Sequence, residues 1–259
     1  MRTYSIPGTD LEVSRIAYGC MNIGGTWDNA PISERDRKTA FQAIMTAYEA
    51  GITLFDHADI YTQGKSEQVF GDLLKTSPHL RESMILQSKC GIRFGGEPQA
   101  HDPQRYDFSY EHIISSVEGI LHRLHTDYLD ILLLHRPDPL MEPEEVARAF
   151  DALLTAGKVR YFGVSNHTAG QIELLQKSMS QRLIINQVEL SLLHNPLINE
   201  GIVANLAGSS ALAAGTLDYC RVQNICIQAW GPLASGKIFA TDPNQDSALG
   251  KTARLVNQL

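Results

Sequence analysis

The stretch Leu129-Asp130-Ile131-Leu132-Leu133-Leu134-His135 decides the fold class of this chain. Apart from Asp130 it is continuously apolar up to His135, a pattern typical of a strand that is covered on both faces. Strands of this kind occur mainly in parallel sheets whose faces carry helices. The stretch therefore indicates an α/β protein, in which short strands alternate with helices.

That alternation extends along the chain on both sides of this stretch. Ser33 and Ser109 are candidate caps of two helices, Glu144 and Glu145 fall in the first turn of a third, and Thr168 begins a fourth. Short apolar runs lie between and beside these helical segments. They predict strands at residues 16–19, 53–56, 84–88, 129–135, 160–164, 183–187 and 225–230, preceded by a small hairpin over residues 3–13.

Two architectures fit seven strand–helix alternations: a barrel short of one strand, or an open doubly wound sheet. The open dinucleotide-binding sheet usually carries GxGxxG after its first strand, and the segment from Gly19 to Gly25 does not have that spacing. We therefore expect a TIM-type (β/α)8 barrel that forms a single domain over residues 1–259. Residues 247–259 resemble the start of a seventh outer helix, so the eighth strand and helix are missing from the pattern and two sheet edges stay open.

Composition excludes several classes of function. The chain has 259 residues, a formal net charge of −7 and a pI near 5.7, which argues against binding to nucleic acid. Its four cysteines form neither a CxxC pair nor a disulfide framework, and we expect no metal. With neither a signal peptide nor a membrane span in the pattern, we expect a cytoplasmic protein that is a monomer or a weak homo-oligomer.

Four reactive side chains are expected at one mouth of the barrel, because the carboxyl ends of parallel strands gather there. Asp56 ends the second predicted strand and Tyr61 follows it, Lys89 follows the third strand, and His135 ends the fourth. Each residue alone has an ordinary explanation, such as a packed tyrosine or a solvated lysine. Four such residues at strand ends are less readily explained by coincidence.

This set suits the reduction of a carbonyl by hydride, in which the substrate oxygen must gain a proton. We expect Tyr61 to donate this proton. We also expect the Lys89 ammonium to lower the pKa of Tyr61 by stabilising the phenolate. Asp56 would keep Lys89 charged and oriented. His135 would donate a hydrogen bond that orients the carbonyl.

The same residues carry a resemblance to the aldo/keto reductase superfamily. The run Asp56-His57-Ala58-Asp59-Ile60-Tyr61 resembles the D-x-A-x-x-Y segment of those enzymes. Three further segments match the family in the same order along the chain: Ser88-Lys89-Cys90, then Leu132-Leu133-Leu134-His135-Arg136-Pro137, and then Gly157-Lys158-Val159-Arg160-Tyr161-Phe162-Gly163-Val164-Ser165-Asn166. The matches cover most of the chain, and their order is stronger evidence than any one motif.

The resemblance implies a nicotinamide cofactor, NADP(H) in the family, with NAD not excluded, and a small-molecule carbonyl substrate. It implies that Ser165, Asn166 and Gln187 hydrogen-bond to the nicotinamide carboxamide. Trp230 would stack on the nicotinamide ring, at a position where the family usually has tyrosine. Gly231, Pro232 and Leu233 would follow the pyrophosphate, and Gly19 with Met21 would line the mouth. Trp27 is a candidate wall of the substrate pocket.

The chain also departs from the family pattern. Thr62 and Gln63 stand between Tyr61 and Gly64 where the family tends to have glycine directly. The region that contacts the adenosine phosphate in the family is missing from the pattern, so the preference for NADPH follows from the resemblance alone. Residues 200–216 resemble an insertion that forms a loop or short helix over the cofactor cleft.

Two other classes of function stay open at this point. A non-enzymatic cofactor-sensing or binding subunit could use the same barrel, and would bind the cofactor without turnover. A barrel lyase could use Lys89 as a Schiff-base nucleophile, which borohydride would trap.

Overall fold

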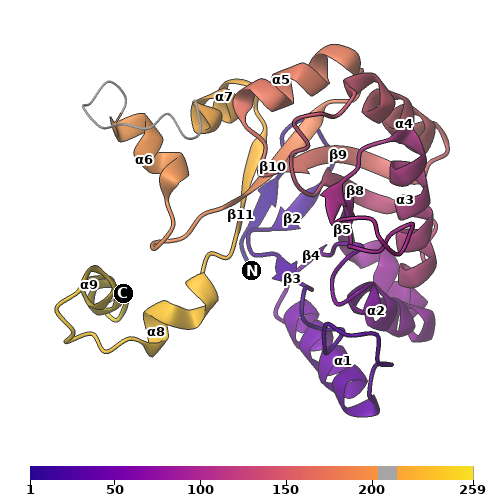
Figure 1. Cartoon of the computed structure of the whole chain (residues 1–259). Helices are drawn as coiled ribbons and strands as arrows, with labels where there is room; N and C mark the ends of the chain where they lie inside the picture. Colours follow the sequence, from indigo (N-terminus) through magenta and orange to yellow (C-terminus); the bar gives the residue numbers. More distant parts are fainter. Residues whose placement is uncertain (204–214, 259) are drawn as a thin grey trace.

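A computed structural model describes residues 1–203 and 215–258 of the chain. Its centre is a parallel sheet of seven strands in the order β11-β10-β9-β8-β5-β4-β3 (Figure 1). Each of the seven predicted strands is confirmed, and so is the parallel α/β architecture. The strands are β3 (Tyr18–Gly19), β4 (Leu54–Asp56), β5 (Ile85–Cys90), β8 (Leu129–Leu134), β9 (Val159–Ser165), β10 (Leu183–Glu189) and β11 (Cys226–Trp230).

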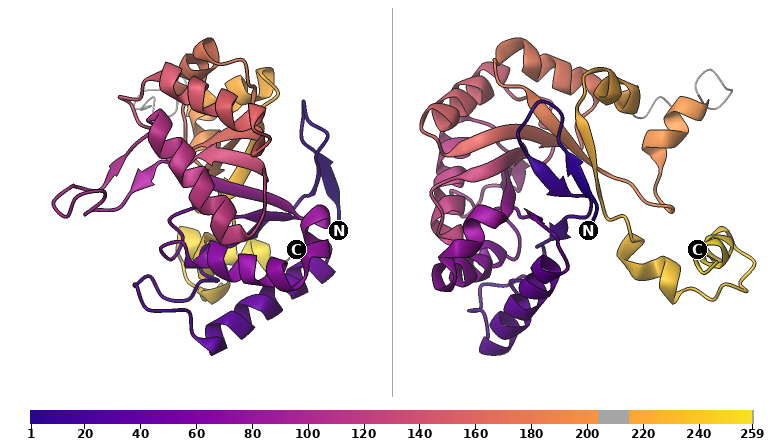
Figure 2. Two further views of the ribbon diagram at one scale, coloured as in Figure 1. Left: turned by 90° about the vertical axis from the view of Figure 1, so that its right-hand side faces the viewer. Right: turned by 180° about the vertical axis from the view of Figure 1, so that it is seen from behind.

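The sheet curls as in a TIM-type barrel but does not close within residues 1–203 and 215–258 (Figures 1 and 2). Strand β3 pairs with β4 alone and strand β11 with β10 alone, so both are edge strands of this sheet. An eighth strand between them is absent from the described part, as the sequence pattern predicts.

Helices follow the strands and cover the outer face of the sheet (Figures 1 and 2). The predicted caps are confirmed: Ser33 accepts a hydrogen bond from the backbone of Asp36, and Thr168 forms a capping box with Gln171. Ser109 caps α3 in the same way as Ser33 caps α1. These outer helices are α1 (Glu34–Glu49), α2 (Lys65–Thr76), α3 (Tyr110–Leu124), α4 (Pro143–Thr155), α5 (Ala169–Ser178) and α7 (Thr216–Val222).

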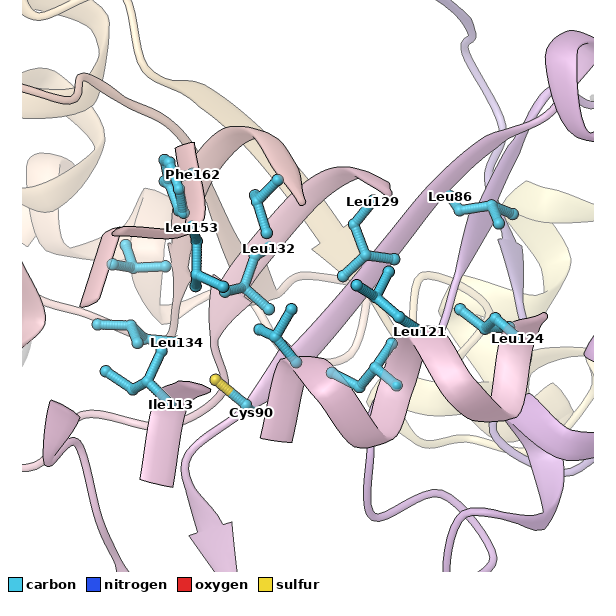
Figure 3. Packing of buried hydrophobic residues seen from close by; sticks show 14 of the residues in the cluster. Leu86, Cys90, Ile113, Leu121, Leu124, Leu129, Leu132, Leu134, Leu153 and Phe162 are labelled. Atoms are coloured by element: carbon cyan, nitrogen blue, oxygen red, sulfur yellow. The ribbon is translucent and has the colours of Figure 1, made fainter. Parts of the chain in front are cut away.

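Strand β8 shows why its sequence is continuously apolar. Ile131 and Leu133 lie in a buried cluster inside the curled sheet, whereas Leu132 and Leu134 lie in the cluster beneath the helices. Figure 3 shows Leu134 near Ile113 of α3 and Leu132 near Leu153 of α4. Because both faces are covered, alternate residues of this strand are equally buried, and each such side chain stabilises the fold by about 1.5–3 kcal/mol.

The amino-terminal hairpin covers the end of the sheet at which the parallel strands begin, opposite Asp56 and Lys89. Strands β1 (Thr3–Ser5) and β2 (Glu12–Ser14) pair antiparallel, as predicted. The hairpin is tied to the sheet by Arg160, which contacts Asp10 in the hairpin turn and Asp130 in β8. Arg81, in the 3-10 helix η1 (Pro78–Ser83), also donates to Asp130 at 3.0 Å. The single charge in the apolar stretch is therefore a partnered buried carboxylate.

The remaining elements lie beside the sheet. A second hairpin, β6 (Ile92–Arg93) with β7 (Arg105–Tyr106), follows β5. Helix α6 (Pro196–Val203) follows β10, while η2 (Ala234–Gly236), α8 (Lys237–Ala240) and α9 (Ala248–Val256) follow β11. None of the helices in the described ranges has the length and apolar character needed to cross a bilayer.

The carboxyl-terminal region differs from the expectation in the position of its last helix. The helix expected after residue 247 is present as α9, capped by Ser247, but it was wrongly placed on the outside of the barrel. Helix α9 packs against α8, and both lie to one side of the sheet beyond β11 (Figures 1 and 2). Most of the suspected insertion over residues 200–216 lies outside the described residues.

Candidate active site

The four candidate catalytic residues meet at the carboxyl end of the sheet. Lys89 is fully buried in β5, and its Nζ donates to the Asp56 carboxylate at 2.8 Å and to the Tyr61 hydroxyl at 3.0 Å. The carbonyl of His57 accepts a third hydrogen bond from Nζ at 2.8 Å. The ring of His135, which follows β8, lies with its centroid 5.8 Å from that of Tyr61. All four predicted residues therefore form one cluster.

The loop after β4 places Tyr61 against Lys89. The backbone of Asp59 donates to the carbonyl of Lys89 at 3.0 Å, which continues the pairing of this segment with β5. After Tyr61 the chain turns through three residues with positive φ, Thr62 at 47°, Gln63 at 60° and Gly64 at 83°. Positive φ is unusual for a β-branched residue. The Thr62 hydroxyl holds this turn by donating to the Tyr61 carbonyl at 2.7 Å.

The expected fall in the pKa of Tyr61 is wrong for the protein without bound ligands. Burial raises the pKa of Tyr61 above 10.0, the Lys89 ammonium lowers it only in part, and the Asp56 carboxylate raises it. Burial wins because the phenolate loses its hydration. Tyr61 is therefore protonated at neutral pH, as a proton donor must be, and the ammonium beside it can stabilise the phenolate that donation leaves.

The neighbouring groups have the protonation states that this chemistry requires. Burial lowers the pKa of Lys89, but Asp56 and Tyr61 raise it by more, so the net shift is upward and Lys89 is an ammonium. Burial lowers the pKa of His135 well below its ordinary value, and the cations Lys89 and Arg136 add to this effect. His135 is therefore neutral at pH 7 and keeps one ring N–H as a donor.

Three glutamines connect the cluster of Asp56, Lys89 and Tyr61 to strands β10 and β11, and the sequence analysis missed two of them. Gln87 in β5 donates to Asp56 at 2.5 Å and to the side-chain oxygen of Gln228 at 2.8 Å. Gln187 of β10 donates to the same oxygen of Gln228. Gln87 is fully buried, and an amide inside an apolar strand is the signal that could have identified it.

Glu67, which the sequence analysis also missed, links the strand of Lys89 to helix α3. Glu67, at the start of α2, is fully buried, accepts from Ser88 at 2.6 Å and pairs with Arg123 at 2.7 Å. Burial raises the pKa of Asp59 to about 8, and the charge of Glu67 adds to the rise. Arg123 partly opposes it. This arrangement fixes the Tyr61 loop and the Lys89 strand to α3.

A cavity of about 1230 Å³ opens over these residues, and it is lined mainly by apolar side chains. Trp230 donates through its indole N–H to Asn166 at 3.0 Å, and the Asn166 amide donates to Ser165 at 2.8 Å. Leu233 is 62% exposed and is not part of the lining. The other predicted cofactor residues all line the cavity, with the wall candidate Trp27: Gly19, Met21, Ser165, Asn166, Gln187, Trp230, Gly231 and Pro232.

Curled parallel sheets with an acidic, basic and phenolic cluster at their carboxyl end define a class of α/β-barrel oxidoreductases. The profile of the aldo/keto reductase family matches residues 15–257, and the chain belongs to that family. The general activity of the family is the reduction of carbonyl groups with a nicotinamide cofactor.

Proteins of similar sequence agree with this assignment. The chain is 41% identical over 240 residues to the uncharacterized oxidoreductase YcsN of Bacillus subtilis, covering 92% of this chain and 72% of that protein. It is 38% identical to a 6-dehydroglucose reductase of Agrobacterium fabrum, covering 89% of this chain and 71% of that protein.

Solved structures show the same fold. The glycerol dehydrogenase AKR11B4 of Gluconobacter oxydans superposes with a TM-score of 0.74 at 27% identity, covering 95% of this chain and 67% of that one. The holo form of an aldo-keto reductase from Bacillus halodurans gives a TM-score of 0.70 at 26% identity, covering 92% of this chain and 68% of that one.

Proposed function

We propose that this protein reduces an aldehyde or ketone to an alcohol with NADPH, and that Tyr61 supplies the proton. The observation that carries the proposal is the position of the Lys89 ammonium, which reaches both the Tyr61 hydroxyl and the Asp56 carboxylate. A buried ammonium beside a phenol is an arrangement that favours loss of the phenol proton to a developing alkoxide.

The four residues take distinct parts in the reaction. Tyr61 transfers its proton to the carbonyl oxygen as the carbon is reduced, and Lys89 stabilises the resulting phenolate. Asp56 keeps Lys89 charged inside the protein, since a lone buried ammonium would be costly. Neutral His135, whose ring lies edge-on to that of Tyr61, donates a hydrogen bond to the same carbonyl oxygen and orients it.

The residues of the cavity fit a nicotinamide cofactor. When bound, reduced nicotinamide supplies a hydride for the carbonyl carbon. Ser165, Asn166 and Gln187 present hydroxyl and amide groups that can bind its carboxamide, and Trp230 presents a ring for stacking. Gly231 has a φ of 64°, and a side-chain carbon at this position would meet no atom within 4 Å, which leaves room for a phosphate beside the backbone.

The proposal extends to the cellular setting. We propose that residues 1–259 act as a single barrel domain, in the cytoplasm, on a small-molecule carbonyl and as a monomer or weak homo-oligomer. Predicted cofactor residues Gly19, Met21, Pro232 and Leu233 belong to the same proposal. Preference for NADPH over NADH follows the family.

Purified protein should oxidise NADPH in the presence of a panel of aldehydes. Tyr61→Phe should lower the rate by roughly 10²–10⁴-fold, because the proton donor is lost. Tyr106→Phe is the matched control, since Tyr106 is an exposed tyrosine of β7 and should leave the rate unchanged. Equal activity of Tyr61→Phe and the parent would refute the role of Tyr61, and tight NADPH binding without turnover would favour a cofactor-binding subunit. Parallel fluorescence titrations with NADPH and NADH measure the cofactor preference.

A further inference from the structure

Most of the charged residues that line the large cavity are cationic, although the protein as a whole is acidic. The chain carries a net charge of −7, yet the charged residues lining the cavity are Arg15, Arg136, Arg221 and the acid Asp56. Asp56 is already neutralised by Lys89. A cationic side chain in the wall of an apolar cavity is suited to an anionic ligand, and which of these arginines lies near the proposed chemistry decides where that ligand would bind.

The three arginines differ in their position and partners. Arg221 pairs with Asp218 on the surface of α7. Arg15 precedes β3 on the amino side of the sheet and hydrogen-bonds through its backbone to Arg2, so it lies at the end of the sheet opposite the catalytic cluster. Arg136 instead follows His135 directly, at the carboxyl end. Arg136 is therefore the arginine closest in the chain to the proposed chemistry.

Arg136 has no acidic partner in the part of the chain that the structure describes. Its guanidinium carbon lies 5.6 Å from the centre of the Trp230 ring, and its side chain is only partly exposed. A contact with an aromatic face holds a guanidinium in place without neutralising it. The charge of Arg136 thus remains available to a ligand in the cavity.

We propose that Arg136 binds an anionic group of the substrate, so that the preferred substrates are aldehydes or ketones that carry a carboxylate. The inference rests on the proposed reductase function and names its substrate class. A guanidinium offers two parallel N–H donors to a carboxylate, a stronger contact than a neutral hydrogen bond. With Tyr61 and His135 on the carbonyl oxygen, Arg136 would fix the other end of the same molecule.

The position of Arg136 separates this role from cofactor binding. The residues proposed to hold the nicotinamide, Ser165, Asn166, Gln187 and Trp230, lie in or directly after β9, β10 and β11, whereas Arg136 follows β8. Tyr61, Ile92 and Trp27, which come from the other half of the sheet, line the same cavity. Arg136 lies between these two groups in strand order, where a substrate would meet the cofactor.

A matched pair of substrates tests the proposal: 4-carboxybenzaldehyde and its methyl ester, methyl 4-formylbenzoate. The parent protein should show the higher kcat/KM with the acid. Arg136→Gln should lower kcat/KM for the acid by roughly 10-fold or more, the loss expected for a charge-assisted hydrogen bond. Its kcat/KM for the ester should stay within about 3-fold of the parent. Arg136→Lys, which keeps the charge but not the paired donors, should retain part of the preference.

Arg221→Gln is the control, because it removes the same charge from another part of the lining. It should leave the preference for the acid unchanged. Equal losses with acid and ester, or a rise in KM for NADPH with both aldehydes, would assign Arg136 to the cofactor and overturn the proposal. A failure of the parent to reduce either aldehyde, or any other of the panel, would instead count against the reductase function itself.

A binding measurement tests Arg136 without turnover. Both tryptophans of the chain, Trp27 and Trp230, line the cavity, so their fluorescence reports its occupancy. 4-Carboxybenzyl alcohol should bind the parent at least roughly 10-fold more tightly than its methyl ester, and Arg136→Gln should abolish that difference. Equal affinity of the parent for the two alcohols, or no binding of the acid, would overturn the inference even in an active reductase.

Discussion

The Nζ of Lys89 lies 3.0 Å from the hydroxyl oxygen of Tyr61, although the two residues come from different segments on either side of helix α2. The contact exists because Lys89 points into the sheet from β5 and the loop after β4 is hydrogen-bonded to the same strand. Lys89 has no exposed surface. The charge of Lys89 therefore depends on Asp56. The pKa of Tyr61 in turn depends on both Lys89, which lowers it, and Asp56, which raises it.

Removing the carboxylate of Asp56 should weaken the fold as well as the chemistry. Asp56→Asn leaves the buried Lys89 ammonium without its anion, so we expect a loss of about 3–5 kcal/mol in the free energy of unfolding at pH 7. Urea unfolding measures this loss. Glu173→Gln, which breaks the exposed pair with Lys177, should change the same free energy by less than about 0.5 kcal/mol. If the two variants are equally stable, Asp56 does not balance the charge of Lys89.

The fold was largely predictable because its strands are short, apolar and bounded by turns. All seven strands of the sheet were placed, and side-chain caps identified helices α1, α3 and α5. Helix α2 was not predicted. Its amino-terminal cap is Gly64, which has no side chain to serve as a signal, and its first turn buries Lys65, Ser66 and Glu67, which are usually surface residues.

The candidate site was predictable only in part, for a different reason. Tyr61, Lys89 and His135 could be placed together because strand ends of a parallel sheet converge. Gln87 with Gln228, and Glu67 with Arg123, depend on contacts between distant segments, which no local pattern encodes. The pKa of Tyr61 depends on the depth of its burial, which only the folded chain determines.

The buried ion pair between Arg123 and Glu67 should be important for stability. Arg123→Met leaves the buried Glu67 carboxylate without its ion-pair partner and near Asp59, so the free energy of unfolding should fall by about 3–5 kcal/mol. Arg148→Met is the matched control, because Arg148 pairs with Glu145 at the surface and should cost less than about 1 kcal/mol. Thermal and urea unfolding distinguish the two. Similar losses in both variants would contradict a special role for Arg123.

The protonation of Asp59 should contribute stability that is lost as pH rises. Burial raises the pKa of Asp59 to about 8, so between pH 4 and 8 the folded chain keeps a proton that the unfolded chain releases. The stability that Asp59 contributes is then highest at the lower end of this window and declines toward pH 8, by on the order of 1 kcal/mol per pH unit. Asp59→Asn should remove this slope. Parallel stability curves for the variant and the parent over pH 5–8 would show that Asp59 is ionised throughout.

The glycine at position 71 should be required by the packing of α2 on α3. A side-chain carbon on Gly71 would lie 2.0 Å from the backbone oxygen of Arg123, so Gly71→Ala forces the two helices apart. We expect a loss of about 1–3 kcal/mol in the free energy of unfolding. Gly170 is also helical, in α5, but a carbon added there meets no atom within 4 Å. Gly170→Ala should therefore stabilise the protein by about 0.4–1 kcal/mol, because the unfolded chain loses freedom. Urea unfolding measures these opposite changes in the free energy of unfolding. If Gly71→Ala is as stable as Gly170→Ala, α2 and α3 do not approach each other this closely.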